Sequence, residues 1–285
     1  MAGPLSLRQL LVRGRQVLEA NDDPAAAPRL EAELLLAGCL GVDRAYLFAH
    51  ADDPVPDEAA EAFHALAARR VRGEPLAYIT GEQEFWSLAL KVNPSVLIPR
   101  PETELLVELA LERMPADMDA RVADIGTGSG AIALAIASER PGAEVHAVDL
   151  SPGALEVARE NARRLGTGNV TFHEGSWCEP LKGEFDLVVS NPPYVRSDDA
   201  HLQAGDLRFE PRMALTPGED EFVAFRAIGE SAGERLRPGG WLLLEHGFEQ
   251  GEAIRELLTQ RGWEAIETHR DLAGNERVTL GRIPV

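Results

Sequence analysis

The stretch that decides the fold is VADIGTGSGAIALAIAS, residues 122–138, in which a short apolar run is followed by three glycines and a longer apolar run. The first run has the length of a buried strand, and the second has the length and spacing of a helix. Gly126, Gly128 and Gly130 let the backbone turn tightly between them and approach a ligand without interference from a Cβ atom. The stretch therefore predicts a strand, a ligand-binding turn and a helix.

An acidic residue follows the turn at a telling distance. Asp149 ends the next apolar run, 19 residues beyond Gly130, where a carboxylate can accept both hydroxyl hydrogens of a ribose. Together the turn and the acid predict an adenosine-type ligand. The kind of adenosine ligand stays open at this point, because Gly126, Gly128 and Ala131 also satisfy the dinucleotide fingerprint, whose last position can be Ala. A nicotinamide-dependent dehydrogenase is therefore an alternative.

Apolar strands and helical stripes alternate on both sides of this turn, as in a doubly wound α/β fold. The segments expected to be helices are 105–111, 132–138 and 154–165, and the expected strands are 122–125, 145–149, 170–173, 185–190 and 241–245. The segments 265–268 and 277–280 have the spacing of an antiparallel edge added to a parallel sheet. We expect a Rossmann-like α/β sheet that is mostly parallel and has an antiparallel edge strand.

Two further parts are expected before this sheet. Residues 5 to about 72 contain apolar stripes at helical spacing, with Pro24, Pro28 and other prolines between them. Residues 78–92 alternate apolar and polar positions around Gly81 and Ser87, which predicts a short hairpin that includes Tyr78 and Ile79. The predicted division is a smaller helical amino-terminal domain over 1–74, a β-hairpin linker over 75–98 and the α/β domain over 99–285.

A second motif lies at the end of a predicted strand. Asn191-Pro192-Pro193-Tyr194 directly follows residues 185–190, at the edge of the sheet where such folds bind ligands. The two prolines lack N–H groups, which leaves the carbonyls of Asn191 and Pro192 free to accept hydrogen bonds. A planar NH₂ group has two hydrogens, so the Asn191 side-chain oxygen and the Pro192 carbonyl can each hold one and aim the nitrogen at a methyl sulfonium. Tyr194 would pack against the flat group. A dehydrogenase gives this tetrapeptide no role, so it favours methyl transfer.

Composition excludes several classes of protein. The chain has 28 basic and 47 acidic residues, a formal net charge of -19 and no basic run, so no direct nucleic-acid partner is expected. Cys39 and Cys178 lie far apart without the close pairs of zinc sites, which predicts free thiols, no metal site and a reducing cytoplasm. No apolar stretch approaches the roughly 20 residues that cross a bilayer, so no membrane association is expected. The arginines before Glu19 also fit an organelle presequence, but helical spacing favours an amphipathic helix of a folded domain.

At these motifs the sequence resembles the class I methyltransferases that modify planar nitrogens, and within them the protein-(glutamine-N5) methyltransferases of bacterial-type release factors. The resemblance covers nearly the whole chain. Besides the glycine turn and the tetrapeptide, its specific stretches are RGEPLAY (72–78), EFWS (84–87), LIPRPETE (97–104), RFEP (208–211), LEHG (244–247) and NERVTLG (275–281).

The resemblance implies S-adenosyl-L-methionine as cofactor and S-adenosyl-L-homocysteine as its product. The methyl acceptor would be the side-chain amide nitrogen of the glutamine in the Gly-Gly-Gln motif of class I peptide chain release factors, which supports translation termination in the cytoplasm. The cofactor-binding residues would be Gly126, Thr127, Gly128, Ser129 and Gly130 at the methionine part, Asp149 at the ribose, Trp177 at the adenine, and Asn191. Asn191 and Pro192 would be catalytic, and Asn191, Pro192, Pro193 and Tyr194 would bind the substrate glutamine. The amino-terminal helical domain would dock the substrate.

Alternatives remain within and outside this family. One is the enzyme that methylates a glutamine of a large-subunit ribosomal protein. Those enzymes carry Ser-Pro after the arginine that corresponds to Arg100, whereas Arg100 is followed by Pro101 here. Another is an adenine-N6 nucleic-acid methyltransferase, which the net charge disfavours. A non-catalytic adenosine sensor would leave Asn191 to Tyr194 unexplained. Ser176 replaces the acid that often precedes the tryptophan in the family, which removes one charged acceptor for the adenine amino group. His246, beside Glu245, is expected to be structural.

Overall fold

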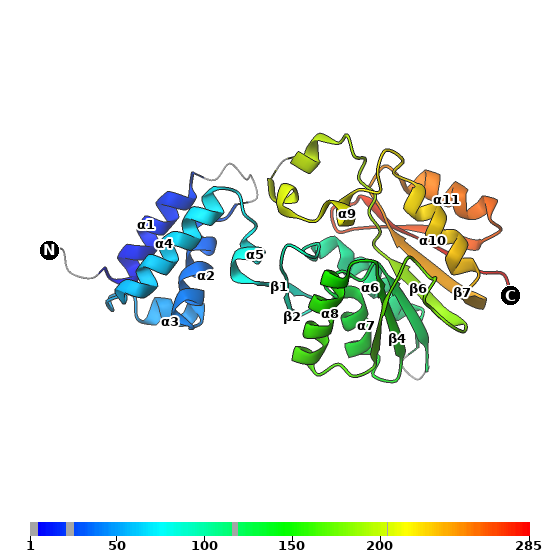
Figure 1. Cartoon of the computed structure of the whole chain (residues 1–285), viewed down its shortest axis with the longest axis horizontal. Coiled ribbons are helices and arrows are strands. Elements are labelled where there is room, and N and C mark those ends of the chain that lie inside the picture. Colours follow the sequence, from blue (N-terminus) through cyan, green and yellow to red (C-terminus); the bar gives the residue numbers. More distant parts are fainter. Residues whose placement is uncertain (1–4, 21–25, 116–118, 204) are drawn as a thin grey trace. The chain divides into compact units, whose positions relative to one another are not determined.

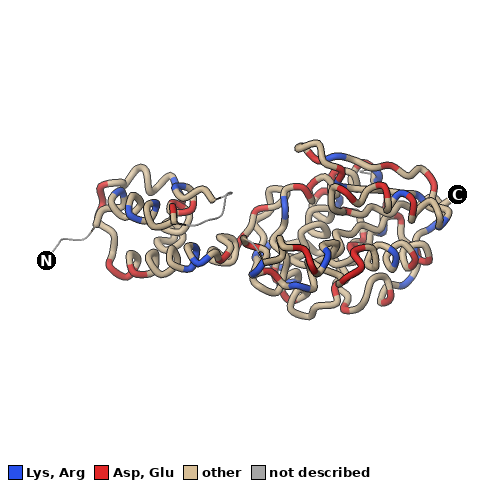
Figure 2. Tube along the Cα trace, turned by 90° about the horizontal axis from the view of Figure 1, so that it is seen from above, with Lys and Arg blue, Asp and Glu red and all other residues tan. Residues whose placement is uncertain are grey.

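The computed structural model describes residues 5–20, 26–115, 119–203 and 205–285, so that Pro24 lies outside the described residues. The chain divides into two compact units (Figure 1). The first consists of Met1–Gly81 and Gln203–Phe209, and the second of Glu82–Leu202 and Glu210–Val285. Both units carry acidic and basic residues interspersed along the chain (Figure 2), consistent with many short ion pairs such as Arg15 with Glu19.

The first unit is a helical bundle. Its elements are α1 (Leu7–Leu18), α2 (Pro28–Leu40), α3 (Arg44–Ala49), α4 (Asp57–Val71), α5 (Leu76–Thr80) and the 3₁₀ helix η3 (Gly205–Phe209). Apolar side chains at helical spacing, among them Leu10, Leu36 and Phe63, are fully buried between α1, α2 and α4. A capping box starts α1, since the Ser6 hydroxyl accepts a hydrogen bond from the Gln9 backbone at 3.3 Å while the Gln9 side chain accepts one from the Ser6 backbone.

Residues 76–91 differ in part from the predicted hairpin. Tyr78 and Ile79 belong to α5, which begins after Pro75 and ends at Gly81 in the left-handed conformation. The prediction of strand for these two residues was wrong, because a proline at the start and a glycine at the end allow one helical turn. The hairpin itself, β1 (Glu82–Phe85) and β2 (Leu88–Lys91), is confirmed. Its turn residues 86 and 87 both have positive φ, as a two-residue hairpin turn requires.

The second unit is built on a seven-stranded sheet of order β5-β4-β3-β6-β7-β9-β8. Its strands are β3 (Arg121–Ile125), β4 (Glu144–Asp149), β5 (Val170–Glu174), β6 (Phe185–Ser190), β7 (Leu236–Glu245), β8 (Glu264–Arg270) and β9 (Glu276–Arg282). The first five pair in parallel, and β9 pairs antiparallel with both β7 and β8. The predicted α/β sheet with an antiparallel edge is confirmed.

Helices cover both faces of this sheet (Figure 1). The helical elements are η1 (Pro101–Thr103), α6 (Glu104–Glu112), α7 (Ala131–Glu139), α8 (Pro152–Leu165), α9 (Arg212–Leu215), α10 (Val223–Gly233) and α11 (Gly251–Gln260), with η2 (Ala200–Gln203) at the boundary between the units. α6 and α7 pack with α8 on one face, and α10 and α11 pack on the other. Residues 131–137 of α7 are apolar on every side of the helix, which fits their burial, while its last two residues are polar and exposed. Within the described residues, no helix is both long enough and apolar enough to cross a membrane.

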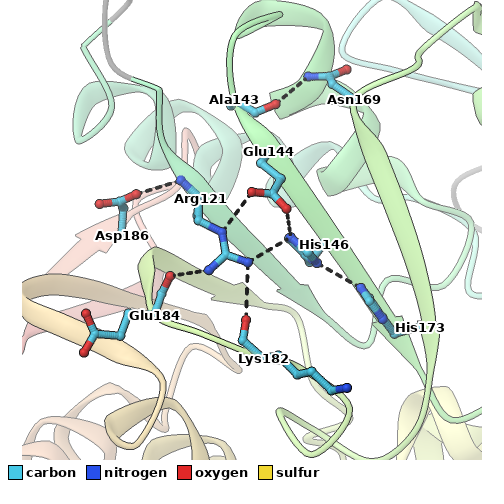
Figure 3. A network of polar contacts seen from close by, with 9 residues as sticks. All are labelled: Arg121, Ala143, Glu144, His146, Asn169, His173, Lys182, Glu184 and Asp186. Atoms are coloured by element: carbon cyan, nitrogen blue, oxygen red, sulfur yellow. Dashed lines mark hydrogen bonds and ion pairs between the residues drawn. The ribbon is translucent and has the colours of Figure 1, made fainter.

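A polar network joins the neighbouring strands β3, β4 and β5 (Figure 3). The Arg121 guanidinium donates to Glu144 at 2.9 Å and lies 4.6 Å from the Phe185 ring centroid. Glu144 in turn contacts His146, whose Nδ1 lies 2.9 Å from Nε2 of His173. Burial and the neighbouring His146 lower the pKa of His173. Two imidazoles in direct contact require one donor and one acceptor, so the network holds at most one of them charged.

We predict opposite effects of alanine at two glycines of the amino-terminal bundle. A Cβ atom at Gly14, buried in α1, would lie 2.2 Å from the Phe63 ring, whereas one at Gly38, exposed in α2, meets no atom within 4 Å. Gly14→Ala should lower the free energy of unfolding by about 1–3 kcal/mol through overpacking. Gly38→Ala should raise the free energy of unfolding by about 0.5–1 kcal/mol, because alanine reduces the conformational entropy of the unfolded chain. Denaturant unfolding of the full chain measures both, and equal stability of the two variants would contradict this packing.

Candidate active site

The candidate active site lies where the parallel strands end. Ile125 of β3 pairs with Ser190 of β6, and the Ser190 hydroxyl donates to the Ile125 carbonyl at 2.7 Å. β4 and β5 extend from β3 in one direction, while β6 and β7 extend in the other. Ligands of open α/β sheets bind in the crevice at such a reversal of strand order. The strand order therefore brings the glycine turn after β3 beside the tetrapeptide after β6.

The glycine turn borders a cavity. Gly126 and Gly128 have φ values of 76° and 56° and line this cavity, and a Cβ atom at either position would meet nothing within 4 Å. A ligand can therefore approach the backbone closely at both positions. Gly130 has another reason to be glycine, because a Cβ atom there would lie 3.0 Å from Leu134 and 3.2 Å from Ala158. It permits α7 and α8 to pack closely beside the turn.

A buried carboxylate holds this turn from below. Oδ2 of Asp124 accepts hydrogen bonds from the Thr127 hydroxyl at 2.6 Å and the Ala133 backbone at 3.1 Å. Burial raises the pKa of Asp124 to about 7, although both hydrogen bonds lower it. Thr127 thus points at Asp124, and the buried Ser129 accepts at its carbonyl from Asn161 at 2.9 Å. Thr127, Ser129 and Gly130 belong to the turn but are not among the residues that line the cavity.

Asp149 reaches the cavity from the end of β4. One carboxylate oxygen accepts from the Gly128 backbone and the other from the Ser151 backbone, both at 2.8 Å. Burial raises the pKa of Asp149, against the lowering effect of these backbone donors. A carboxylate has about four acceptor positions, so Asp149 can still accept from a ligand hydroxyl beside its backbone donors. The arrangement fits the ribose of an adenosine ligand.

Trp177 lies on the same cavity, next to Ser176 and Gly175. Its backbone has a φ of 46°, an uncommon conformation for a bulky residue that the surrounding structure must enforce. Its ring packs against the core on the α10 and α11 face of the sheet. The position fits a flat apolar surface beside an adenine.

The tetrapeptide divides between the cavity and the core. Asn191 and Pro193 line the cavity, whereas Pro192 is buried and Tyr194 is not among the lining residues. Asn191 Nδ2 donates to the Thr103 hydroxyl at 3.2 Å. Burial raises the pKa of Tyr194, whose hydroxyl interacts with Arg277. The structure thus brings Asn191 and Pro193 to the same cavity as the glycines, Asp149 and Trp177.

The sequence interpretation missed other walls of the cavity. They come from two separate segments, represented by Ser95, Val96, Leu97, Pro211, Met213 and Ala214. An ion pair between Arg100 and the buried Glu210 joins these segments, and Glu210 also accepts from the Ile98 backbone at 3.1 Å. The only signal in the sequence was the presence of LIPRPETE and RFEP among the family-like stretches. Within the described residues, no group of three or more His, Cys, Asp or Glu side chains is arranged to hold a metal ion.

The residues around the cavity fit an adenosine ligand with an amino-acid extension. The open backbone at Gly126 and Gly128 leaves space that any side chain would fill. Oδ1 of the buried Asp124 lies below the turn without a hydrogen-bond partner among the described residues. The acid at the ribose position and the aromatic ring at the adenine position complete a set that S-adenosyl-L-methionine would satisfy.

Comparisons with known proteins agree with this geometry. Residues 9–81 match the family described as the PrmC N-terminal domain, and residues 102–219 match the methyltransferase small domain. The chain is 53% identical over 257 residues to a release factor glutamine methyltransferase of Xylella fastidiosa strain Temecula1, covering 90% of this chain and 94% of that protein. It is 47% identical to a protein of the same name from Aliivibrio fischeri strain ES114, with 98% of both chains covered. The chain belongs to the release factor glutamine methyltransferase family.

The fold of this methyltransferase is shared more widely. The structure of a ribosomal protein L11 methylase from Lactobacillus delbrueckii subsp. bulgaricus matches 69% of this chain and 86% of its own, with a TM-score of 0.51 and 21% identity. That likeness concerns the fold alone. Membership of the methyltransferase family removes the dehydrogenase alternative that the glycine fingerprint had left open.

The pKa of Asp124 generates a prediction about stability. Because its pKa in the folded protein, about 7, lies above the unfolded value of 3.8, the folded protein retains a proton that the unfolded chain releases. The contribution of Asp124 to stability is full below pH 4 and is lost as the pH rises through 7. Asp124→Asn cannot ionise, so its stability relative to the native protein should increase from pH 5 to pH 8. Denaturant midpoints at both values test this, and a constant difference would contradict the assignment.

Proposed function

We propose that this enzyme transfers a methyl group from S-adenosyl-L-methionine to the side-chain amide nitrogen of a glutamine. The glutamine is that of the Gly-Gly-Gln motif in class I peptide chain release factors. The observation that carries the proposal is the position of Asn191 and Pro193 on the same cavity as Gly126, Gly128 and Asp149. Relatives that cover at least 90% of the chain bear the name of this activity. Translation termination places the activity in the cytoplasm.

The cofactor supplies a methyl group on a positively charged sulfur, and the chain supplies its binding site. The backbone at Gly126 to Gly130 would hold the methionine part, with Asp124 keeping the turn in shape. Asp149 would accept the ribose hydroxyls, and Trp177 would pack on the adenine. Ser176 offers a hydroxyl where relatives of this type often have an acid, so the adenine amino group has one charged acceptor fewer.

Asn191 would orient the substrate amide. The glutamine NH₂ group has two hydrogens, one for the Asn191 side-chain oxygen and one for the Pro192 carbonyl. An amide nitrogen is a poor nucleophile, because its lone pair is delocalised into its carbonyl. Fixing both hydrogens aims the nitrogen and draws electron density onto it. The methylated nitrogen becomes far more acidic, so its proton can pass to water or to the Asn191 oxygen without a strong general base.

The division of labour along the chain is part of the proposal. We assign substrate docking to the helical domain over 1–74, a linker to 75–98 and catalysis to 99–285. A separate helical module on a methyltransferase usually recognises a macromolecule. A ribosomal-protein glutamine is less favoured as acceptor, because Pro101-Glu102 follows Arg100 here. A nucleic-acid adenine is less favoured because acidic residues are interspersed with the basic ones in both units (Figure 2).

The proposal predicts methyl transfer to one residue of one kind of protein. Purified release factor should accept labelled methyl from S-adenosyl-L-methionine, and a factor with the Gly-Gly-Gln glutamine changed to alanine should not. The matched factor controls for methylation elsewhere. No label on either factor, with cofactor still bound to the enzyme, would sink the assignment of the substrate and leave the fold and family standing.

The role of Asn191 predicts a separation of binding from turnover. Asn191→Ala should lower kcat by about 100-fold or more, because it removes an acceptor that positions the nitrogen. Cofactor affinity should stay within a few fold, since Gly126, Asp149 and Trp177 are unchanged. Isothermal titration with S-adenosyl-L-homocysteine and single-turnover transfer measure the two quantities. Loss of both together would count against this role.

A further inference from the structure

Behind Asn191, away from the cavity, lie two buried polar side chains that the proposed reaction does not use. Thr103 ends η1 and is 4% exposed, and Glu245 ends β7 and is 2% exposed. Thr103 accepts a hydrogen bond from Asn191 Nδ2 at 3.2 Å. Ser190 of β6 pairs with Leu244 of β7, so that Asn191 and Glu245 lie beside each other where these strands end, and hydrogen bonding from the Thr103 and Asn191 side chains lowers the pKa of Glu245. The three residues come from separate segments and form one small network.

The network has a definite direction. A carboxylate only accepts hydrogen bonds, and a hydroxyl has a single hydrogen to donate. Once the Thr103 hydrogen points at ionised Glu245, Thr103 can only accept from Asn191. The side chain of Asn191 must then turn its NH₂ group toward Thr103 and Glu245. Its Oδ1, which accepts no hydrogen bond from the described residues, is the atom left for the cavity that Asn191 lines.

The direction matters because an asparagine amide can rotate by half a turn. Its O and N are nearly equal in size, so packing alone does not choose between the two orientations. The rotated form would present donors to the substrate NH₂ group, which itself has only donors. It would also place Oδ1 against a buried carboxylate. A pair of acceptors behind Asn191 therefore excludes the unproductive orientation.

We propose that Glu245 and Thr103 are positioning residues that hold the Asn191 side chain with its oxygen toward the substrate amide. The proposal rests on the proposed function of Asn191. Glu245 acts through the orientation of Asn191 and does not touch the substrate. Its Oε2 has no hydrogen-bond partner among the described residues, and burying such a group costs free energy that a glutamine or leucine would avoid. Orienting Asn191 accounts for a carboxylate at this position.

The network is sensitive to pH. Burial raises the pKa of Glu245 to about 7, and the nearby Glu102 raises it further, while the hydrogen bonds and the charge of Arg277 lower it. Of the other groups that face it, Tyr194 has a raised pKa and His246 a lowered one, both through burial, so both are neutral near pH 7. Protonated Glu245 can donate to Oδ1 of Asn191 and permit the rotated form. Turnover should therefore fall as the pH drops through 7.

The test compares kcat for methyl transfer between pH 5.5 and 8.5 in the native enzyme and in Glu245→Gln. A glutamine can donate as well as accept, so this variant should lower kcat by about 10-fold or more and abolish the step near pH 7. Thr103→Val removes the hydroxyl and should lower kcat to a similar extent. Thr103→Ser keeps the hydroxyl and should have a kcat close to that of the native enzyme. The double variant Glu245→Gln with Thr103→Val should cost no more than either change alone. The KM for release factor and the affinity for S-adenosyl-L-homocysteine should change little, which also verifies folding.

Glu144→Gln is the matched control. It makes the same chemical change at the start of β4, in the network of Figure 3, and should leave kcat and its pH profile unchanged. The proposal would be overturned if kcat of Glu245→Gln depended on pH as it does in the native enzyme. It would also be overturned if kcat of Thr103→Ser were as low as that of Thr103→Val.

A second readout separates this proposal from the proposed function. In ¹⁵N spectra of the enzyme with S-adenosyl-L-homocysteine, the Asn191 NH₂ resonances, assigned by their loss in Asn191→Ala, should shift as the pH passes 7. They should not shift in Glu245→Gln. This result supports the network even if release factor accepts no methyl group, in which case only the assigned substrate fails. If the Asn191 resonances shifted neither with pH nor on the change Glu245→Gln, the network would be refuted. This holds even if the enzyme methylates the release factor.

Discussion

The site depends on one constraint, the adjacency of β3 and β6 in the sheet. Because the two strands run parallel and in register from Val122 with Leu187 to Ile125 with Ser190, they end together. Whatever follows each strand must then share a crevice. A hydrogen bond of 2.7 Å from the Ser190 hydroxyl to the Ile125 carbonyl joins the two strand ends. A shift of register by one residue would move the glycine turn away from Asn191 and reverse which side chains face the core.

Two buried acids at this edge perform similar work on different partners. Asp124 below the glycine turn and Glu245 at the end of β7 are both nearly inaccessible, and burial raises the pKa of each to about 7. Hydrogen bonding from a threonine lowers the pKa of each, from Thr127 in one case and from Thr103 in the other. Burying a carboxylate costs free energy. Because it only accepts hydrogen bonds, however, it fixes the orientation of the donors around it. Such fixed orientation suits a site that acts by orienting the substrate.

The sequence predicted those parts of the fold and site that local chemistry determines. Glycines that need positive φ, an acid at the end of β4 and an asparagine before two prolines are visible without a structure. α10 and α11 were not predicted, and β7 begins at Leu236, five residues before the predicted start at residue 241. The walls near Val96 and Met213 were also missed, because the ion pair of Arg100 with Glu210 joins segments that lie 110 positions apart. Such pairings depend on the tertiary fold. The roles of individual site residues and the two boundaries between the three predicted segments stay predictions.

The chemistry explains why orientation outweighs acid-base catalysis here. A carboxylate or imidazole close to the acceptor nitrogen would gain little, since the amide is not deprotonated before attack and releases its proton readily afterwards. The nitrogen must instead lie in line with the methyl donor, and an error of about 1 Å costs about 100-fold in rate. A neutral asparagine offers the needed acceptor without a charge of its own, but its side-chain amide can rotate. The buried acid therefore belongs one layer behind the substrate, where its charge selects the orientation of Asn191 and does not compete for the methyl group.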